Sequence, residues 1–442
     1  MRRGPRVVLA GLGVIGWGSA CSVETDLGVV TGSGEGGIET GETGEVGVPL
    51  DVSEPDTVIN DYRALAVDAD RVASLTVVGD LEGWAVGDRV MVWQTATIDP
   101  LTITADDEVD AMSGSLGAWE LSRIAAVEGA RLDLEAPLEG RYVAPGAQVV
   151  RVPEWSSVRI AQGAGVVALP WDGQRGGIVV LLAAEDVVGR VSADGAGFRG
   201  GAHADANTGA VGFCEDDDDA GVRGAYKGEG IATATFAAGG QGRGFVANGG
   251  GGGVCWRAGG GGGAGGGRGG VGGRSSNWDN SRADAGGQGG RALARPAGRL
   301  MLGGGGGGGH GAGDEAIRDG GAGGGVVFVS AASFDGTLSA SGLDAPEARN
   351  DGAAGGGGGG TIYLGVTAGA TCQSARAAGG AGGNVFVSDT AAYGPGGGGG
   401  GGFAILLGAP ECTADVRGGP HGWLMGDRQY GAEDGRVGVI ER

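Results

Sequence analysis

Lysine is almost absent from this chain. Lys227 is the only lysine among 31 basic residues, which face 53 acidic ones and give a formal net charge of −22. Removing the arginines of an N-terminal leader, Arg2, Arg3 and Arg6, would leave 31 − 3 = 28 basic residues and a net charge of 28 − 53 = −25. Since binding to nucleic acid requires a basic face that neutralises phosphates, the composition argues against nucleic acid as a partner.

The chain also has little from which a metal or nucleophile site could be built. Its histidines are His203, His310 and His421, and none has a serine or cysteine beside it in a recognisable nucleophile motif. No C-x-x-C motif occurs, and the glycine runs lack the G-x-x-x-x-G-K-[ST] spacing of a phosphate-binding loop. We therefore expect no zinc site and no acyl transfer, and predict a non-enzymatic protein without a cofactor.

One cluster of charged residues leaves an alternative open. A polysaccharide lyase or hydrolase on a β-solenoid needs carboxylates or arginines clustered on one strand face. Asp186, Arg190, Asp194 and Arg199 form the only such set in the sequence, and ordinary surface charge explains them more simply. A carbohydrate-active enzyme is therefore one alternative function, and a glycan-binding module is the other.

An acidic run is the one candidate for metal binding. Several carboxylate oxygens can hold Ca²⁺, although consecutive like charges more often form a solvated turn. The candidate calcium ligands are Glu215, Asp216, Asp217, Asp218 and Asp219.

Glycine, by contrast, is abundant, with 108 residues, and it alternates with short apolar runs in a repeat. Each unit has a glycine run, an apolar segment and a smaller second piece. The copy GGIVVLLAAEDVVGRVSADG (176–195) can be laid over GGVVFVSAASFDGTLSASG (324–342), so that GRVSADG falls on GTLSASG. The other apolar segments are TIYLGV (361–366), followed by CQSARAAGG (372–380), and FAILLG (403–408), followed by CTADVRGG (412–419).

The apolar segments predict strands that are buried on both faces. They are about five residues long, rich in Val, Ile, Leu and aromatic residues, and bounded by glycine, whereas a helix needs about ten residues. One unit cannot cover its own apolar surface, so equivalent strands should pair from unit to unit. We predict an all-β fold in which stacked β-repeats form a β-solenoid or a similar stacked sheet.

The glycine runs have two interpretations. Polyglycine loses much entropy on ordering and is usually a flexible linker. Alternatively, the runs form polyproline-II segments packed side by side, because residues without Cβ allow backbones to approach on every side of a three-fold helix. We favour the ordered arrangement, because the runs adjoin predicted buried strands at repeated positions. A collagen helix is not expected without a strict Gly-X-Y period.

Two cysteines occupy nearly equivalent places in neighbouring units. Cys372 follows one apolar segment by a turn and Cys412 follows the next. Equivalent positions in paired strands lie about 4.8 Å apart, within the Cα separation of about 4.4 to 6.8 Å that a disulfide accepts. We predict a Cys372–Cys412 disulfide; the alternative is two free buried thiols.

The N-terminus has the pattern of an export signal. Three arginines precede an apolar core, Val7 to Trp17, that is too short to span a bilayer. Gly18-Ser19-Ala20 supplies small residues for cleavage, and Cys21 follows directly, as in the lipobox of bacterial lipoproteins. The resemblance implies a diacylglycerol on Cys21 and, since Ser22 and not Asp follows, sorting to the outer membrane; Gly18 departs from the usual Leu. The alternative is an ordinary signal peptide cut near Ala20.

Cysteine number agrees with lipidation and export. Five cysteines minus Cys21 leave Cys214, Cys255, Cys372 and Cys412. Four cysteines allow three connectivities, of which Cys214–Cys255 with Cys372–Cys412 is the most local.

Between the signal and the repeats, two further regions are predicted. Residues 21–56 are rich in Gly, Glu, Thr and Ser and should form a disordered acidic tether, with a span on the order of 30 to 35 Å. Residues 57–170 contain alternating segments separated by turns and predict a small, barrel-like β domain. Trp84, Trp93 and Trp119 are expected as its core anchors.

The long insert at 196–322, within the glycine-rich region 171–442, is the candidate binding region. Long inserts on one edge of a repeat stack often carry function. The residues suited to contact a glycan or an envelope protein are Tyr226, Trp256, Arg257 and Trp278.

Several motifs recur in a characteristic order along the chain: VGDRVMVWQ, WELSRIAAVEGARLDLEAPL, WDGQRGGIVVLLA, GRVSADGAGFRGG, NGGGGG, GGGVVFV and GGGGGGTIYL. In this order of motifs the chain resembles glycine-rich exported surface proteins of gliding and other soil or marine bacteria, including adventurous gliding motility proteins. The resemblance covers most of residues 75–408 and implies an envelope protein without assigned catalytic residues. The expected function is that of a non-enzymatic, lipid-anchored outer-membrane protein with a structural or adhesive role, in four parts: signal 1–20, tether 21–56, small β domain 57–170 and glycine-rich domain 171–442.

Overall fold

The structure is a computed structural model that describes residues 47–97, 107–112, 114–205, 224–232, 240–254, 256–275, 286–311, 319–388, 391–409, 411–426 and 428–442. Residues 40–442 form one compact unit, and residues 1–39 are a separate unit outside the described residues. The described part of the chain contains strands and no helix. The prediction of an all-β fold is confirmed.

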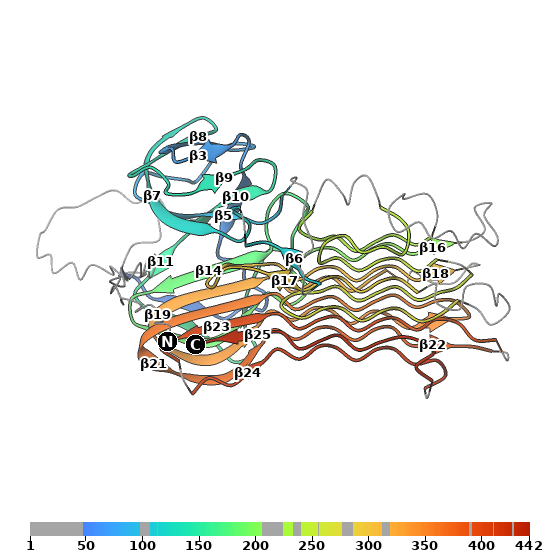
Figure 1. Cartoon of the computed structure of the whole chain (residues 1–442). Helices are drawn as coiled ribbons and strands as arrows, with labels where there is room; N and C mark the ends of the chain where they lie inside the picture. The colour runs from blue at the N-terminus through green and yellow to red at the C-terminus, as the bar shows by residue number, and fades with distance from the viewer. Residues whose placement is uncertain are drawn as a thin grey trace, which may run out of the picture. The chain divides into compact units, whose positions relative to one another are not determined.

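A parallel sheet runs through the protein, as Figure 1 shows. Its main path is β1 (Leu50–Val52), β12 (Val158–Ile160), β15 (Asp186–Ser192), β19 (Val326–Ser339), β21 (Thr361–Arg376), β23 (Phe403–Leu407) and β25 (Val439–Glu441). The strands beside this path are β11 (Glu154–Trp155), β13 (Val166–Val167), β14 (Ile178–Ala183) and β24 (Ala414–Asp415).

The register of this sheet matches the sequence repeat. Ile178 pairs with Val326, Val326 with Thr361, and Thr361 with Phe403. Gly189 pairs with Gly336, as the overlay of GRVSADG on GTLSASG predicts. Each unit therefore places its apolar segment beside the equivalent segment of the next unit.

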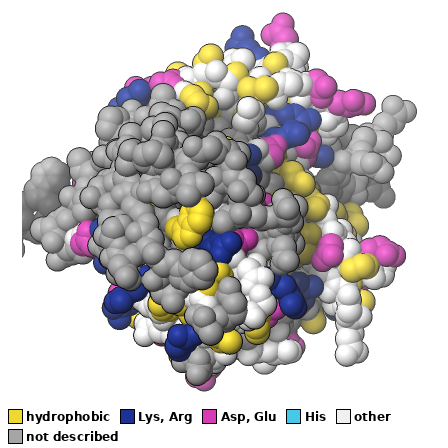
Figure 2. Space-filling model, turned by 90° about the vertical axis from the view of Figure 1, so that its right-hand side faces the viewer, with side chains coloured by type: hydrophobic (Ala, Val, Ile, Leu, Met, Phe, Trp, Pro, Cys, Tyr) yellow, Lys and Arg dark blue, Asp and Glu magenta, His cyan; other side chains and the backbone are white. Residues whose placement is uncertain are grey.

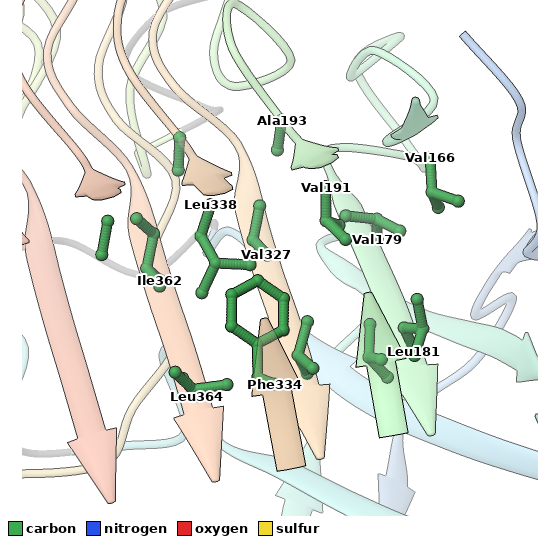
Figure 3. Packing of buried hydrophobic residues seen from close by; sticks show 14 of the residues in the cluster. Val166, Val179, Leu181, Val191, Ala193, Val327, Phe334, Leu338, Ile362 and Leu364 are labelled. Carbon is green, nitrogen blue, oxygen red and sulfur yellow. The ribbon is translucent and has the colours of Figure 1, made fainter. Parts of the chain in front are cut away.

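Both faces of the repeated strands are buried. Val327, Val329, Ile362 and Leu364 point into one core, together with Phe334 and Leu338 from the second half of β19 (Figure 3). The alternate residues, among them Val326 and Phe328, enter a second core. There Phe328 and Tyr363 stack, with ring centroids 4.4 Å apart. Burial on both faces explains why the segments are apolar throughout, without polar alternation.

The predicted disulfide between Cys372 and Cys412 is present, with a Cα–Cα distance of 4.7 Å. It joins neighbouring units, because β21, which contains Cys372, pairs with β24 immediately after Cys412. The spacing of neighbouring strands therefore brings the two thiols together, as the sequence positions predict.

A six-stranded antiparallel sheet precedes the repeats, in the order β2 (Asp61–Ala64), β10 (Ala147–Val152), β5 (Arg89–Gln94), β7 (Trp119–Glu128), β8 (Arg131–Leu134) and β4 (Ser74–Thr76). A bridge between Leu65 and Val77 joins the two edge strands where they end. Trp84 and Trp93 are buried there, as expected of core anchors. Trp119 is half-buried and packs edge-on against Phe328 of the parallel sheet, 5.0 Å between centroids.

The structure corrects two domain boundaries. Residues 50–52, inside the predicted tether, form β1 and pair with Val158 to Ile160. Strands β11 to β13, inside the predicted small domain, also belong to the parallel sheet. The chain thus joins the repeat stack first, leaves it for the antiparallel sheet and then returns. Three-residue strands that pair only with distant residues carry too little periodicity to be recognised in sequence.

The glycine runs form extended segments that pass side by side out from the parallel sheet and back (Figure 1). Residues 303–309 show their geometry. A Cβ added at Gly303, Gly306 or Gly309 would meet carbonyl oxygens of 352–358, and one at Gly304 or Gly307 would meet those of 248–251. This period of three is that of a polyproline-II helix.

Hydrogen bonds connect this segment to neighbours on all sides. Gly303, Gly304 and Gly305 donate their N–H groups to three different segments, at 2.9, 2.8 and 2.9 Å, and accept N–H groups from three others, at 3.1, 2.8 and 2.9 Å. The neighbours are 197–202, 224–231, 246–254, 258–265, 320–325 and 352–360. Because the backbone polar groups are paired inside the bundle, the glycine runs are ordered, as predicted, and are not linkers.

Side chains end this lattice at its outer surface. In the segment 432–438, Ala432 is buried and Gly435 and Gly438 are half-buried, whereas Glu433, Asp434, Arg436 and Val437 are exposed. A glycine therefore stands where a segment meets its neighbours, and charged residues stand where no further segment can pack. This pattern limits growth of the bundle.

Two-residue strands complete the fold. They pair as β3 (Ala69–Asp70) with β9 (Arg141–Tyr142), β6 (Val109–Asp110) with β17 (Leu293–Ala294), β16 (Ala204–Asp205) with β18 (His310–Gly311), and β20 (Ala348–Arg349) with β22 (Val385–Phe386).

Asp61 makes the stability of the antiparallel sheet dependent on acid pH. Its burial raises the carboxyl pKa, but hydrogen bonds from Trp84 Nε1, the Tyr62 N–H and Arg63 outweigh burial, so the pKa is lowered. A carboxylate with a lowered pKa stabilises the fold above its unfolded-state pKa of about 3.9, and this contribution is lost as pH falls below about 4. We expect the denaturant concentration at the midpoint of unfolding to be lower at pH 3 than at pH 5. This difference should be smaller in Asp61→Asn. An equal fall in both proteins would contradict this role of Asp61.

Candidate functional site

The far end of the glycine bundle collects the turns between outgoing and returning segments. Segment 303–309 runs outward parallel to 248–251, and 352–358 returns antiparallel to it. We call this end the tip; it lies opposite the parallel sheet (Figure 1). The described tip residues are 203–205, 256–257, 310–311, 345–351, 384–388, 391–393, 423–426 and 428–431.

A small core of its own supports the tip. Ala348, Val385 and Leu424 are buried in it, each from a different turn. Ala348 pairs with Val385, and Val385 with Leu424, all in parallel. The three turns therefore continue the repeat at the tip, with strands of only one or two residues.

The residues on either side of these three positions face outward. Glu347 and Arg349 flank Ala348, Asn384 and Phe386 flank Val385, and Trp423 and Met425 flank Leu424. Phe386 and Trp423 are each 40% exposed and Met425 is 49% exposed. Because alternate residues of a strand share a face, the side chains of residues 347, 349, 384, 386 and 423 form one surface, and Met425, in the turn that follows with φ of 57°, borders it. We call Glu347, Arg349, Asn384, Phe386, Trp423 and Met425 the tip grid.

Neighbouring groups hold Trp423 in place. Its N–H donates to Asn384 Oδ1 at 2.9 Å, and its ring contacts the edge of His421, with centroids 4.3 Å apart. The His421 N–H donates to Asp434 Oδ1 at 2.9 Å, and Arg428 approaches Met425 Sδ at 3.7 Å. Trp423 is thus held by contacts of both its backbone and its ring.

Arg257, one of the predicted binding residues, ties two turns together at the tip. Its Nε lies 3.1 Å from Asp351 Oδ1, and its guanidinium lies 4.5 Å from the centroid of Tyr393 and hydrogen-bonds the Tyr393 hydroxyl. Its N–H donates to His310 Nδ1 at 3.2 Å. Asp351 is 4% exposed, so Arg257 pairs with a buried carboxylate. Arg257 therefore has a structural contact, in addition to any role in binding.

Burial also affects Tyr430 at the base of these turns. It raises the pKa of the Tyr430 hydroxyl, against the opposing effect of Arg274 and Arg428. The hydroxyl donates to the Ser275 carbonyl at 3.0 Å. Tyr430 therefore stays neutral and joins its turn to the backbone at Ser275.

The other predicted binding residues are divided between the tip and undescribed regions. Tyr226 is 44% exposed, and its carbonyl accepts the N–H of Gly308, close to the tip. Trp256 is half-buried beside Arg257, with φ of 35°. The remaining candidates lie outside the described residues: Trp278, Cys21, Cys214, Cys255 and the calcium candidates Glu215 to Asp219.

Sequence reasoning did not find Phe386, Trp423 or Met425. The sequence signal is faint, because NVFVS at 384–388 and GWLMG at 422–426 are runs of three apolar residues in which only the middle or first residue is buried, as Val385 and Leu424 are. Such short runs are common by chance, so they become informative only when the pairing of Val385 with Leu424 is known.

Three of the four residues of the carbohydrate-enzyme alternative have separate partners, and the fourth, Arg190, is exposed. Asp186 lies 3.9 Å from Arg159, beside an open cavity of about 420 Å³ that Asp51 also lines. Asp194 accepts hydrogen bonds from Ser192, Ser339 and the Ser341 N–H. Arg199 pairs with the buried Glu229 at 2.9 Å.

No group of three or more His, Cys, Asp or Glu residues in the described ranges is arranged to hold a metal ion. The described part of the chain also has no helix long and apolar enough to cross a membrane. Figure 2 views the molecule from the side of the tip and shows hydrophobic, cationic and acidic side chains interspersed among the described residues of this face.

Comparisons with known proteins add little. No family model and no curated protein matches the chain. Among solved structures, the tailspike gp61 of Pseudomonas phage phi297 aligns with 33% of this chain and 23% of its own, at 19% identity and a TM-score of 0.18. A TM-score at this level supports no argument about fold or function.

Proposed function

We propose that this protein is a non-enzymatic, lipid-anchored protein of the bacterial outer membrane that presents the tip for adhesion. The observation that carries the proposal is the position of the turns. The described chain enters the parallel sheet at β1, whereas the turns with exposed aromatic residues lie at the opposite end of the glycine bundle. Seven glycines of polyproline-II geometry place the tip roughly 20 Å beyond the sheet.

The bundle suits this role because it is stiff without a conventional apolar core. A segment such as 303–309 is hydrogen-bonded to neighbours on all sides, and its close packing leaves no room for a side chain. An arrangement of this kind holds the turns in fixed relative positions. Binding residues carried on loops above a rigid scaffold are a common arrangement in binding proteins.

Attachment to the membrane is the sequence-based part of the proposal. The small residues before Cys21 and the acidic segment after it match a lipoprotein signal and a tether. The resemblance to glycine-rich exported surface proteins supports the same location. The partner of the tip would then be a surface glycan or an envelope protein.

Replacing Cys21 tests this proposal. We expect the full-length protein, made in a Gram-negative host, to incorporate labelled palmitate, to fractionate with outer membranes and to be cleaved by protease added to whole cells. Cys21→Ser should lose the label and the membrane association. Cys255→Ser is the matched control, and it should keep both. Membrane association that is unchanged in Cys21→Ser would contradict lipid anchoring, and protection from external protease would contradict surface display.

A further inference from the structure

We infer that the tip grid is a binding site for a neutral saccharide. The inference rests on the proposed adhesive function and names the ligand of that function. It depends on the juxtaposition of three turns, 347–349, 384–386 and 423–425. These turns are far apart in the sequence, but their central residues pair with one another at the tip.

The dimensions of the grid fit a small saccharide. Strand neighbours lie about 4.8 Å apart and alternate residues of one strand about 6.6 Å apart. The grid has three neighbouring strands with two outward-facing positions on each, so it measures roughly 10 Å across the strands and 7 Å along them. Stable protein interfaces bury about 800 Å² on each partner, which is about ten times the area of the grid. The grid by itself is therefore too small for a protein partner and comparable in size to a disaccharide.

The chemistry of the grid matches the two kinds of surface on a sugar ring. The C–H face of a pyranose is apolar and lies flat on an aromatic ring, for which Phe386 and Trp423 are both exposed. The hydroxyl groups at the rim of a pyranose both donate and accept hydrogen bonds. Glu347 and Arg349 are exposed beside these rings and supply acceptors and donors.

Asn384 adds a third polar group with a defined orientation. Its Oδ1 accepts the Trp423 N–H at 2.9 Å, so the amide group next to the Trp423 backbone is fixed and its NH₂ is the donor that it can offer. The Trp423 ring is in turn held by His421. Binding would therefore require little ordering of the grid, which reduces its entropic cost.

Charge favours a neutral ligand over an anionic one. The grid has one acidic residue, Glu347, and one basic residue, Arg349, so its formal net charge is zero. The chain as a whole carries −22 and repels polyanions such as uronate or sulfated polymers. We expect affinity near the millimolar range, as for a single shallow site.

A glycan array followed by titration of the purified full-length protein tests the inference. The array should carry neutral hexose and N-acetylhexosamine oligosaccharides beside sialylated, uronate and sulfated ones. We expect binding to neutral members, and saturation-transfer NMR with the best of them should show at least ten-fold weaker binding by Trp423→Ala and by Phe386→Ala. Trp423→Phe, which keeps an aromatic ring, should retain most of the affinity.

The controls separate this inference from the proposed function. Val86→Ala, which changes an exposed apolar residue in the turn before β5, should bind like the unmodified protein, and unchanged thermal unfolding of the grid variants would show that they fold. Absence of binding to every neutral saccharide, or binding unaffected by Trp423→Ala and Phe386→Ala, would overturn the saccharide site. The palmitate and whole-cell protease results do not depend on these variants, so anchoring and surface display can stand when sugar binding fails.

Discussion

Replacing Gly304 with alanine should unfold the glycine bundle. A Cβ at this position would lie below 3.0 Å from the carbonyl oxygen of Asn248, a distance that real Cβ contacts do not reach. The obstacle is backbone, which cannot rotate away as a side chain can. The segments must separate, and separation also breaks the hydrogen bonds that Gly304 makes with Ala264 and Gly358, both 2.8 Å.

The expected effect is larger than that of an ordinary overpacked core. Inserting one methyl group into a packed core usually costs about 1 to 3 kcal/mol. Here the neighbours of Gly304 are themselves fixed by further neighbours, so displacement spreads through the bundle, and we expect a loss of at least about 4 kcal/mol. Denaturant unfolding measures this loss. Limited proteolysis should show new cleavage within the described glycine segments of 240–325, which should resist protease in the unmodified protein.

Gly165→Ala is the matched control for this experiment. Gly165 is also buried, but a Cβ there would first meet Arg190 Nη1, at 3.2 Å, the movable end of a long side chain. We expect a change in stability within about 0.5 kcal/mol. Equal stability of the Gly304 and Gly165 variants would contradict the packed bundle and favour flexible glycine runs.

The sequence was sufficient for the repeat and for the pairing of its strands. The side chains of the repeat determine its alignment in the sequence. Aligning the repeated units places Ile178 on Val326 and Gly189 on Gly336, and the same residues pair in the parallel sheet. The disulfide followed from the same alignment, since equivalent positions of paired strands must be close together.

The neighbours of each glycine segment could not be predicted. A run such as 303–309 has no side chains to distinguish one register or partner from another, and its six neighbours come from residues as distant as 197 and 360. Only the general expectation of packed polyproline-II segments was accessible. Boundary errors at β1 have a related cause, because Leu50 to Val52 acquire strand structure only through Val158 to Ile160.

At the tip, composition pointed to one useful region but not to the exposed surface. Trp256 and Arg257 attracted attention as an aromatic and a cation within a long insert, and Arg257 proved to pair with buried Asp351. Trp423 lies outside that insert, in a turn of the last repeat. Its place near Phe386 depends on the pairing of two turns in the folded protein. Trp423 and Asn384, which are hydrogen-bonded there, lie 39 residues apart in the sequence.

Removing the disulfide should produce the second large loss of stability. The bridge between Cys372 and Cys412 closes a sequence separation of 40 residues. In the chain-entropy account, cross-linking a loop of this length restricts the unfolded state and stabilises the fold by about 4 kcal/mol. The double variant Cys372→Ala/Cys412→Ala should lose an amount of this order, which denaturant unfolding under non-reducing conditions measures.

Reduction distinguishes the unfolded-state effect from loss of packing. Cys412 is only 1% exposed, so its replacement by alanine also removes a buried sulfur, whereas dithiothreitol opens the bridge and leaves both sulfur atoms in place. Most of the loss should therefore appear in the reduced unmodified protein, and the response of the double variant to dithiothreitol should reveal the contribution of any bridge between Cys214 and Cys255. Unfolding midpoints that are equal for the oxidised, reduced and double-variant proteins would contradict the stabilising role of the bridge. In that case the ladder between β21 and β24 would hold neighbouring units together without it.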